Sequence, residues 1–548
     1  MKFPEQFDLF QEKVPQTVSI DESAQRMSVS SATIRNWLKT GYLKTAGQGQ
    51  ITEDSLIHFQ KEIAGKEKLN QRANKSLKDS HNHDSTTSFF IEQAKSRAGA
   101  GHNLGEDYES SLSNSYRNKE GIYYTPPEIV RDLFVIPKVN LDNVTFCDPC
   151  CGSGNFIIQA LELGFSPENV YGYDTDPVAV EITISRIRQY CGHSGANIQA
   201  GDFLQFASEG KVQQFDYIYT NPPWGKKLTK DEKIYFGRYF KAGTSIDTCS
   251  LFFFASLKHL KPNGTLGLLL PEAFFNIAAF ESARIKALSL SIERLVNYGK
   301  PFKGLLSKAQ GVVLSNAPGE RDHPVKCDSN GKCVIRSIES FSRNPKSIFN
   351  FSCDQDTVDT LHYLFSVPHI TLDGRASWGL GIVTGNNEKF IQSSPQEGYI
   401  PVFKGSDILQ SGLKQPSNYI PSDLSFYQQV APRHLFESKE KLIYKFISSS
   451  LCFYCDTQQR FVLNSANMLI PNDDFPIPIS VLGEVLNSNF MNWVFSSIFN
   501  THKVLRADLE SLPIYSQFLE GLSKFDESAY LENLNIERKS NGAYRIKR

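Results

Sequence analysis

The sequence predicts a doubly wound α/β domain that lies between a small N-terminal helical unit and a C-terminal region of mixed α and β structure. Three observations support this prediction. Short apolar runs alternate with helical stretches from Phe89 to about Asn316, which is the pattern of a mainly parallel sheet. A polar stretch without apolar periodicity, 66–88, precedes this region. After about Pro318 the apolar runs become short and alternating, which indicates a second, β-rich region.

The expected strands of the α/β domain are seven short apolar runs, and helical candidates lie between most of them. Ligands of such sheets bind beyond the carboxyl ends of the strands, so the residues that follow each run are the candidates for chemistry. The expected strands are 144–149, 169–174, 197–202, 216–221, 265–271, 293–299 and 311–316.

The composition is that of an ordinary globular protein, with 40% hydrophobic and 21% charged residues. A chain of 548 residues is too long for one core. The formal net charge is −1, so local patches would have to attract any nucleic acid. No apolar run is long enough to span a membrane, and the N-terminus lacks the pattern of a secretion signal. The ten cysteines have no disulfide-framework spacing, so we expect reduced thiols and a cytoplasmic location.

We expect four segments along the chain. A small helical unit at 1–65 is followed by a linker at 66–88. The α/β domain is expected at 89–325, and the C-terminal region with a basic tail is expected at 326–548. The tail, 536–548, has five basic residues and one acidic residue, and we expect it to be disordered.

The first expected strand ends in a glycine-rich turn that opens a helix. Asp148 ends the strand, and Gly152 and Gly154 let the backbone bend sharply and approach a ligand closely. Amide groups of the turn and of the helix N-terminus can face a carboxylate of that ligand. Such a turn also occurs in ordinary strand–helix connections, so the residues after the next strands decide between the two interpretations.

Acidic residues follow the next two expected strands. Asp174 stands where an acid accepts hydrogen bonds from ribose hydroxyls. Asp202 can accept a hydrogen bond from an adenine amino group, and the Phe203 ring can pack on the face of that adenine. One acid at a strand end is often a helix cap, but three in successive units favour a nucleoside site. If the ligand is S-adenosylmethionine, this site has to hold only one nucleoside without phosphate.

The motif Asn221-Pro222-Pro223-Trp224 follows the fourth expected strand and is the most specific signal in the chain. An aromatic amine is a poor nucleophile because its lone pair is delocalised into the ring. The Asn221 side-chain oxygen and the Pro222 carbonyl can each accept one amino hydrogen, which favours a pyramidal nitrogen with a localised lone pair. The prolines, including Pro223, fix the turn. Trp224 can stack on a base and stabilise the cationic character of a methyl group in transit.

These residues resemble the gamma class of N6-adenine DNA methyltransferases, of the TaqI-like kind. The upstream segment Gly121–Pro127 is similar to the segment that precedes the cofactor loop in that class. The resemblance implies that Thr125 and Pro126 line the methionine end of S-adenosylmethionine. Two positions depart from the class: Cys150 replaces a small Ala or Pro, and Trp224 replaces the commoner Tyr or Phe. Neither departure removes a group that the chemistry requires.

The resemblance continues beyond the α/β domain. The segments 378–387, 402–408 and 486–514 are similar to the family's target-recognition signatures, so the similarity spans roughly 104–515. It implies a Rossmann-like sheet of the S-adenosylmethionine-dependent methyltransferase kind, followed by a mixed α+β target-recognition domain.

The resemblance also implies an aromatic contact to a flipped base. Phe302 follows the sixth expected strand, near the place where an aromatic ring sandwiches the base in this family. Phe252 is a weaker candidate for a wall of the cofactor pocket. Ordinary packing explains a single Phe equally well.

A basic stretch follows the Asn-Pro-Pro-Trp motif directly. Residues 226–241 hold six basic and two acidic residues with interleaved Tyr and Phe, and they begin with Lys226 and Lys227. Beside an active site, such a stretch suggests a mobile loop that contacts DNA phosphates and helps to offset the cost of base flipping. A solvated helix is the equally good alternative.

The N-terminal unit has a pattern of its own. A capped helix begins at Ser19, a second helix follows at 29–38, and a glycine-containing hairpin and a third helix from Thr52 complete it. The pattern resembles the winged helix-turn-helix of the MerR and excisionase type, which implies that Arg35 and Asn36 face DNA. A protein-docking module with the same fold is the alternative.

A zinc site is the remaining interpretation to weigh, because Cys452 and Cys455 are closely spaced. They lie in a strand-like run, where a spacing of three points side chains to opposite faces, so we expect no metal.

Taken together, these features predict a site-specific DNA methyltransferase. It would transfer a methyl group from S-adenosylmethionine to the N6 amino group of adenine in double-stranded DNA by base flipping, in restriction-modification or related phage defence. We find no nuclease motif, so a restriction endonuclease or defence subunit would be a separate partner. The alternatives are transfer to cytosine N4, to RNA adenine or to a glutamine amide, and a catalytically inactive DNA-binding specificity subunit.

Overall fold

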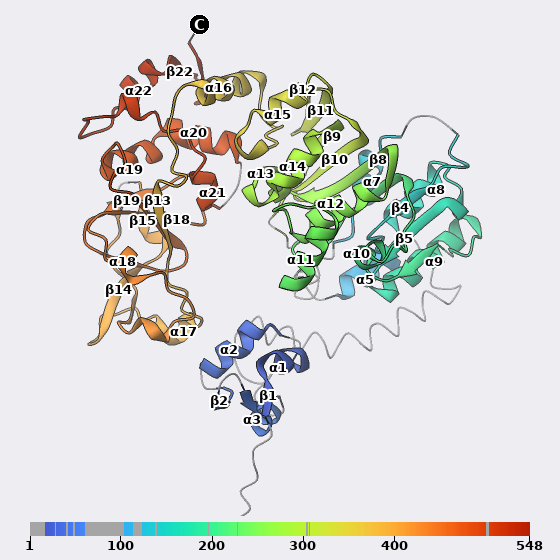
Figure 1. Ribbon diagram of the computed structural model, residues 1–548, viewed down its shortest axis with the longest axis horizontal. Coiled ribbons are helices and arrows are strands. Elements are labelled where there is room, and N and C mark those ends of the chain that lie inside the picture. The colour runs from blue at the N-terminus through green and yellow to red at the C-terminus, as the bar shows by residue number, and fades with distance from the viewer. Residues whose placement is uncertain are drawn as a thin grey trace, which may run out of the picture. The chain divides into compact units, whose positions relative to one another are not determined.

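The chain forms two compact units, one made of residues 1–89 with 112–116 and the other of residues 90–111 with 117–548 (Figure 1). The computed structural model describes residues 17–27, 29–39, 42–47, 50–60, 104–112, 123–136, 140–195, 197–226, 228–302, 305, 307–410, 412–499 and 503–547.

The N-terminal unit combines short helices with a small sheet of strand order β1-β3-β2. Ser19 caps α1 by accepting a hydrogen bond from the Glu22 amide, as the sequence predicts. Ile34 and Trp37 on α2 are buried, and the Trp37 ring packs on Phe59 with ring centroids 4.5 Å apart. The order of elements follows the sequence expectation, and the winged helix-turn-helix assignment stays a prediction. The elements are β1 (Thr17–Ser19), α1 (Ile20–Arg26), α2 (Ser31–Lys39), β2 (Thr45–Gly47), β3 (Gln50–Thr52) and α3 (Glu53–His58).

A nine-stranded sheet forms the centre of the α/β domain, with the order β12-β11-β9-β10-β8-β7-β4-β5-β6. Strands β4 to β8 run parallel, and β10 runs antiparallel to β8 and β9. All the strands expected from the sequence are present. The strands are β4 (Phe146–Asp148), β5 (Val170–Asp174), β6 (Ile198–Ala200), β7 (Phe215–Thr220), β8 (Leu260–Pro271), β9 (Leu290–Gly299), β10 (Ala309–Pro318), β11 (Pro324–Ser329) and β12 (Lys332–Ser337).

The hairpin of β11 and β12 extends the sheet beyond the boundary that the sequence suggests. β11 runs parallel to β9, with Cys327 beside Leu295, so the expected boundary at 325 falls inside a strand of the sheet. The α/β domain therefore continues at least to Ser337. The sequence did not indicate this later boundary, because the edge strand β12 exposes Val334 and Ile335 and so lacks a clear apolar face.

Both faces of the sheet are covered by helices, as a doubly wound fold requires (Figure 1). Neighbouring residues of one strand point to opposite faces: Leu268 packs in one core and Leu269 in the other. Helices α7, α8 and α9 contribute to the Leu269 core, and α10, α12 and α14 contribute to the Leu268 core. The helices are α5 (Leu104–Ser111), α7 (Pro127–Leu133), α8 (Asn155–Glu162), α9 (Pro177–Cys191), α10 (Phe203–Ser208), α11 (Lys230–Tyr239), α12 (Thr248–Lys258), α13 (Glu272–Asn276), α14 (Glu281–Leu288) and α15 (Ile338–Ser342).

The C-terminal region contains a four-stranded sheet, β13-β21-β18-β19, and a three-stranded sheet, β17-β14-β20. Helices α19 and α20 supply much of its largest apolar core. The elements are α16 (Gln355–Ser366), β13 (Ala376–Leu380), α17 (Asn387–Phe390), β14 (Tyr399–Phe403), β15 (Ile408–Leu409), β16 (Gly412–Leu413), β17 (Tyr419–Pro421), α18 (Arg433–Phe436), β18 (Lys441–Lys445), β19 (Phe453–Asp456), β20 (Phe461–Val462), β21 (Ala466–Pro471), α19 (Ile479–Asn487), α20 (Asn489–Ile498), α21 (Arg506–Leu509), α22 (Glu527–Asn533), β22 (Ile536–Arg538) and β23 (Tyr544–Ile546).

The basic tail is ordered, so the expectation that it is disordered is wrong. β22 and β23 form an antiparallel hairpin. Tyr544 is buried and lies 5.3 Å from the Phe490 ring on α20, measured between ring centroids. The sequence misleads here because the apolar side chains that anchor the hairpin are separated by charged residues.

Within the described part of the chain, no helix is both long and apolar enough to cross a bilayer.

A buried arginine of the α/β domain and a buried aspartate of the C-terminal region interact electrostatically. Arg284 on α14 is fully buried and donates hydrogen bonds to four main-chain carbonyl oxygens, those of Phe274, Ile277, Lys346 and Ser347. Asp508 on α21 is also fully buried, and neither of its carboxylate oxygens has a hydrogen-bond partner among the described residues. Burial raises the pKa of Asp508 to about 7, although the nearby Arg284 acts to lower it.

We predict that Asp508→Asn raises the melting temperature more at pH 8 than at pH 5. The pKa of Asp508 is about 7 in the folded chain against a usual value of 3.8, so the folded state binds this proton more tightly. Wild-type stability therefore falls as the pH rises from about 4 to about 7, by an amount on the order of a few kcal/mol, whereas Asn cannot ionise. The exposed Asp473→Asn should show no such trend. Equal effects of Asp508→Asn at both pH values would contradict this account.

Candidate active site

The glycine-rich turn between β4 and α8 bends as the sequence predicts. Gly152 has φ +49° and Gly154 has φ +87°, which are left-handed values that favour glycine. A Cβ atom at Gly152 would lie 2.9 Å from the Tyr124 ring, and one at Gly154 would lie 2.8 Å from the Thr183 hydroxyl. The Thr183 hydroxyl also donates a hydrogen bond of 2.8 Å to the Gly152 carbonyl. The turn is therefore held rigidly with its backbone close to its neighbours.

Two acidic residues from the sequence prediction meet beside this turn. Asp174, at the end of β5, accepts hydrogen bonds from the amides of Gly152 and Asp176 at 2.8 and 2.9 Å. Burial raises the pKa of Asp174 to about 6, and the Lys226 ammonium acts to lower it. Asp148 is fully buried, and burial raises its pKa to about 7. One Asp148 oxygen accepts from the Cys150 amide at 3.1 Å. The Thr220 side chain acts to lower the pKa of Asp148, although the second oxygen has no hydrogen bond of ordinary geometry within the described residues.

The third acid and the two phenylalanines have structural contacts of their own. Asp202 caps α10 by accepting a hydrogen bond of 2.8 Å from the Leu204 amide. Phe203 is buried in the core and stacks against Phe252, with ring centroids 6.2 Å apart. Capping and packing account for these contacts, and the adenine-binding and pocket-wall roles expected for Asp202, Phe203 and Phe252 stay predictions.

Helix α5 adds residues to this site that the sequence analysis missed. Tyr108 on α5 is fully buried, and its hydroxyl donates a hydrogen bond of 2.7 Å to Asp176. Asp176 also caps α9, so the tyrosine fixes the residue that follows the acidic end of β5. Gly105 lies so close to Ser153 that a Cβ atom would come within 2.7 Å of the serine side chain. The sequence does not indicate the contact between Tyr108 and Asp176, because α5 and α9 are far apart in the chain.

Asn221 lies just after β7, at the same edge of the sheet as Asp148 and Asp174. Its side-chain nitrogen donates a hydrogen bond of 2.8 Å to the main-chain carbonyl of Tyr123. Its side-chain oxygen is buried and has no hydrogen-bond partner in the part of the chain that is described. An unpaired buried acceptor is costly, so it indicates a site for a ligand that donates a hydrogen bond.

Tyr123, whose carbonyl holds Asn221, belongs to a cluster of three aromatic rings. Trp224 and Phe302 meet edge to face with ring centroids 5.3 Å apart, and Tyr123 lies 5.5 Å from Phe302. All three side chains are buried. The Trp224 indole N–H donates to the Leu269 carbonyl at 3.4 Å. The structure thus brings the predicted residues Asn221, Trp224 and Phe302 together, with Tyr123 as a member that the sequence analysis did not single out.

Thr125 and Pro126 link this aromatic group to the glycine-rich turn. The Thr125 carbonyl accepts a hydrogen bond of 2.8 Å from the side chain of Asn155, the first residue of α8. Pro126 caps α7, and its carbonyl begins the hydrogen bonding of that helix. Pro222 is buried and Pro223 is partly buried, both in the turn after β7.

The basic stretch after the motif contains helix α11. Thr229 and Glu232 cap it with reciprocal hydrogen bonds, which favours the helical alternative for residues 230–239. Lys226 is partly exposed, and its charge acts on Asp174. Lys227 lies outside the described residues. The predicted contacts with DNA phosphates stay predictions.

Two further predicted site residues, Arg35 and Asn36, belong to the N-terminal unit. Arg35 is exposed on α2, and the side chain of Asn36 lies outside the described part of the structure. Cys452 and Cys455 are both free cysteines. Across the described residues, no group of His, Cys, Asp and Glu side chains is arranged to hold a metal ion.

Two family models match the chain. The N-6 DNA Methylase model matches residues 99–289, and the TaqI-like C-terminal specificity domain model matches residues 400–514. The first match covers the turn and the Asn-Pro-Pro-Trp motif, and the second covers most of the recognition signatures expected from the sequence.

Individual proteins give the same result. Type II methyltransferase M.VspI of Vibrio sp. (strain 343) is 48% identical over 74% of this chain and 99% of its own length. Modification methylase CviBIII of Paramecium bursaria Chlorella virus NC1A is 25% identical over 42% of this chain, and the match spans 61% of that relative. In fold, the chain is similar to the Type IIL restriction-modification enzyme MmeI in complex with DNA, with a TM-score of 0.50 and 12% identity over 77% of this chain and 71% of that one.

The relative that is 48% identical over nearly its whole length shows the family, and both family models agree with it. The chain belongs to the TaqI-like N-6 DNA methylases, which are DNA methyltransferases with a C-terminal specificity domain.

Proposed function

We propose that this DNA methyltransferase transfers a methyl group from S-adenosylmethionine to the N6 amino group of an adenine that is flipped out of duplex DNA. The observation that carries the proposal is the orientation of the Asn221 amide. Its nitrogen is held by the Tyr123 carbonyl, so its buried oxygen is left as an acceptor for an amino hydrogen. Membership of the N-6 DNA methylase family supports adenine as the base.

The residues at the sheet edge fit S-adenosylmethionine. The left-handed glycines give the sharp turn that brings backbone amides to this edge, and Asp174 keeps lone pairs for ribose hydroxyls after accepting two amide hydrogens. The unpaired buried oxygen of Asp148 suits a cationic ligand, since a nearby positive charge favours its ionised form. Thr125 and Pro126, by family resemblance, line the methionine end. When bound there, the cofactor supplies an electrophilic methyl group on a sulfonium.

The protein therefore has to orient the amine, and it needs no strong base. The Asn221 oxygen and the Pro222 carbonyl each accept one amino hydrogen, which localises the lone pair on nitrogen. Trp224 and Phe302 offer faces for the base. The centroids of these two rings lie 5.3 Å apart, so the rings contact each other. A base that stacks on either ring has to replace this contact. The buried surroundings of Asn221 exclude water from its oxygen and strengthen the hydrogen bond that it forms.

The biological setting that we propose is restriction-modification or related phage defence. M.VspI is named as a Type II methyltransferase, and MmeI as a restriction-modification enzyme. A separate restriction endonuclease would then act at the same DNA sequence.

We predict that Asn221→Ala lowers the rate of methyl transfer at least about 100-fold and leaves cofactor affinity nearly unchanged, because the loss removes one preorganised polar contact to the reacting group. The purified chain is incubated with duplex DNA and labelled S-adenosylmethionine, and the digested DNA is analysed for methylated nucleosides. The wild type should yield N6-methyladenine. The exposed Asn140→Ala serves as the matched control. Methylated cytosine, methylation of RNA only, or normal turnover by Asn221→Ala would overturn the proposed function.

We predict that affinity for S-adenosylmethionine rises between pH 5.5 and pH 8. The pKa values of Asp174 and Asp148 are about 6 and about 7, so both carboxyls gain their negative charge in this window, and the charged forms favour a cationic ligand. Asp174→Ala should weaken binding by about 1–3 kcal/mol and flatten part of the pH dependence. Calorimetry at several pH values measures both effects, with the exposed Asp142→Ala as control. A pH-independent affinity would show that neither carboxylate faces the cofactor.

We predict that deletion of residues 1–85 preserves which adenine is methylated. The deletion removes every described residue of the N-terminal unit except Leu112, whereas the specificity-domain match lies at 400–514. The truncated chain should bind DNA more weakly and with a flatter salt dependence if the N-terminal unit contributes phosphate contacts. Modification-aware sequencing of DNA from expressing cells identifies the methylated sites. A changed recognition sequence would show that the N-terminal unit selects bases for the reaction.

A further inference from the structure

A groove in the specificity domain combines basic, amide and aromatic side chains. It has a volume of about 510 Å³ and is formed by β14, the segment after β16, the end of β19, and the turn between β19 and β20. Lys414 and Gln415 on one segment are exposed, and Gln458 and Gln459 on the turn are exposed as well. No Asp or Glu is among the described residues that line it, so its charge suits a polyanion.

The turn 457–460 is anchored by one buried carboxylate. Asp456 and Lys441 form an ion pair of 2.7 Å in which both side chains are completely buried. The other hydrogen bonds of Asp456 come from the turn itself. Its carboxylate accepts from the amides of Gln458 and Arg460 at 3.1 and 2.8 Å, and from the Arg460 guanidinium at 2.7 Å. Taking two charges out of water is costly, so this arrangement indicates that the turn has to adopt one conformation.

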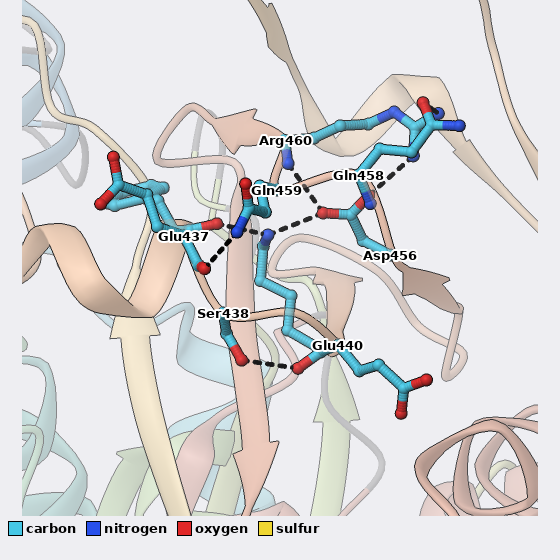
Figure 2. Close-up of polar contacts among 9 residues, drawn as sticks. Glu437, Ser438, Glu440, Asp456, Gln458, Gln459 and Arg460 are labelled. Atoms are coloured by element: carbon cyan, nitrogen blue, oxygen red, sulfur yellow. Dashed lines mark hydrogen bonds and ion pairs between the residues drawn. The ribbon is translucent and has the colours of Figure 1, made fainter.

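Arg460 is held from several sides, and Figure 2 shows its contacts with Asp456 and Gln458. One terminal nitrogen donates to Asp456 at 2.7 Å, and the other donates to the Gln458 side-chain oxygen at 2.6 Å. The guanidinium also lies over the rings of Phe403 and Tyr454, 5.8 and 5.7 Å from their centroids. The side chain remains 21% exposed, so the fixed guanidinium still reaches the groove.

The neighbouring glutamines are arranged in a complementary way. The Gln458 side-chain oxygen is occupied by Arg460, which leaves its amide hydrogens as donors. The Gln459 side-chain nitrogen donates to the Glu437 carbonyl at 2.7 Å, which leaves its oxygen as an acceptor. The groove therefore presents donors and an acceptor with fixed positions, which is what recognition of base edges requires.

We propose that the turn 457–460 reads base edges of the target DNA, and that Arg460 donates to the O6 and N7 acceptors of a guanine in the recognition sequence. This inference rests on the proposed function, since it needs duplex DNA as the substrate. Arg is the side chain that matches guanine in the major groove with two parallel hydrogen bonds. The contact with Asp456 fixes the guanidinium before DNA binds, so little side-chain entropy is lost on binding. Lys414 also lines the groove and adds positive charge to it.

The test is a selection of bound sequences from a random duplex library, using the full chain as wild type, Arg460→Ala and Arg460→Lys. Binding is the readout, so the result does not depend on methyl transfer. We expect the wild type to enrich a sequence with a required G·C pair, and both variants to lose preference at that one pair by about 5- to 100-fold. Lys keeps the charge but lacks the planar pair of donors, so it should not restore the preference.

Arg433→Ala is the matched control, because Arg433 also pairs with an acid at the i,i+4 position, is exposed and does not line the groove. Its enriched sequence should equal that of the wild type. The Arg460 variants should melt cooperatively and bind the cofactor with normal affinity, which excludes misfolding as the cause.

A preference that is kept in Arg460→Lys would mean that the planar pair of donors is not needed, and it would overturn the inference. An unchanged preference in both variants would overturn it as well. Either result leaves the proposed methyl transfer intact. A wild-type chain that methylates adenine but enriches no sequence would overturn the inference alone, whereas a chain that selects a sequence without methylating DNA would overturn the proposed function alone.

Discussion

The parallel order of β4, β5 and β7 is the constraint on which the site depends. Parallel strands end at one edge of a sheet, and here their ends carry Asp148, Asp174 and Asn221. Residues that are far apart in the sequence therefore lie at one edge of the sheet. The glycine-rich turn after β4 adds backbone amides at the same edge, so both candidate binding functions, for a nucleoside and for an amine, arise from strand direction alone.

Burial of polar groups gives this edge its chemical character. The Asn221 side chain is oriented by one hydrogen bond to the Tyr123 carbonyl, which lies 98 residues earlier. Its free oxygen, and the free oxygen of Asp148, are buried without partners among the described residues. Such groups lower the free energy of unfolding unless a ligand pairs with them, so the site makes the fold less stable when no ligand is bound. In the specificity domain, by contrast, the buried Asp456 carboxylate has hydrogen-bond partners on both oxygens and holds a turn in place.

Much of the fold could be predicted from the sequence, because the strands of the central sheet are apolar and end in recognisable turn residues. The glycine-rich turn and the Asn-Pro-Pro-Trp motif are local, so their positions at strand ends could be predicted as well. The hairpin at 324–337 could not, since its edge strand exposes apolar residues such as Ile335. The ordered C-terminal hairpin could not be predicted, because its apolar side chains Ile536, Tyr544 and Ile546 are separated by polar and charged residues.

The parts of the site that could not be predicted depend on contacts between distant segments. The Tyr123 carbonyl is a main-chain group, so the residue type does not indicate that it orients Asn221. The Tyr108 contact with Asp176 depends on how α5 packs against α9. The Phe203 ring is buried against Phe252, a contact that its sequence position did not indicate, and its role beside the cofactor stays a prediction.

The measurement that tests the central claim most directly is a crystal structure of the full chain with a duplex containing its target and a non-reactive cofactor analogue. The account predicts an adenine outside the helix, with its exocyclic nitrogen within about 3.2 Å of the Asn221 side-chain oxygen. The Asn221 nitrogen should remain on the Tyr123 carbonyl. An adenine whose amino group contacts neither Asn221 nor Pro222, or an Asn221 amide that has turned to donate its nitrogen to the base, would contradict the account.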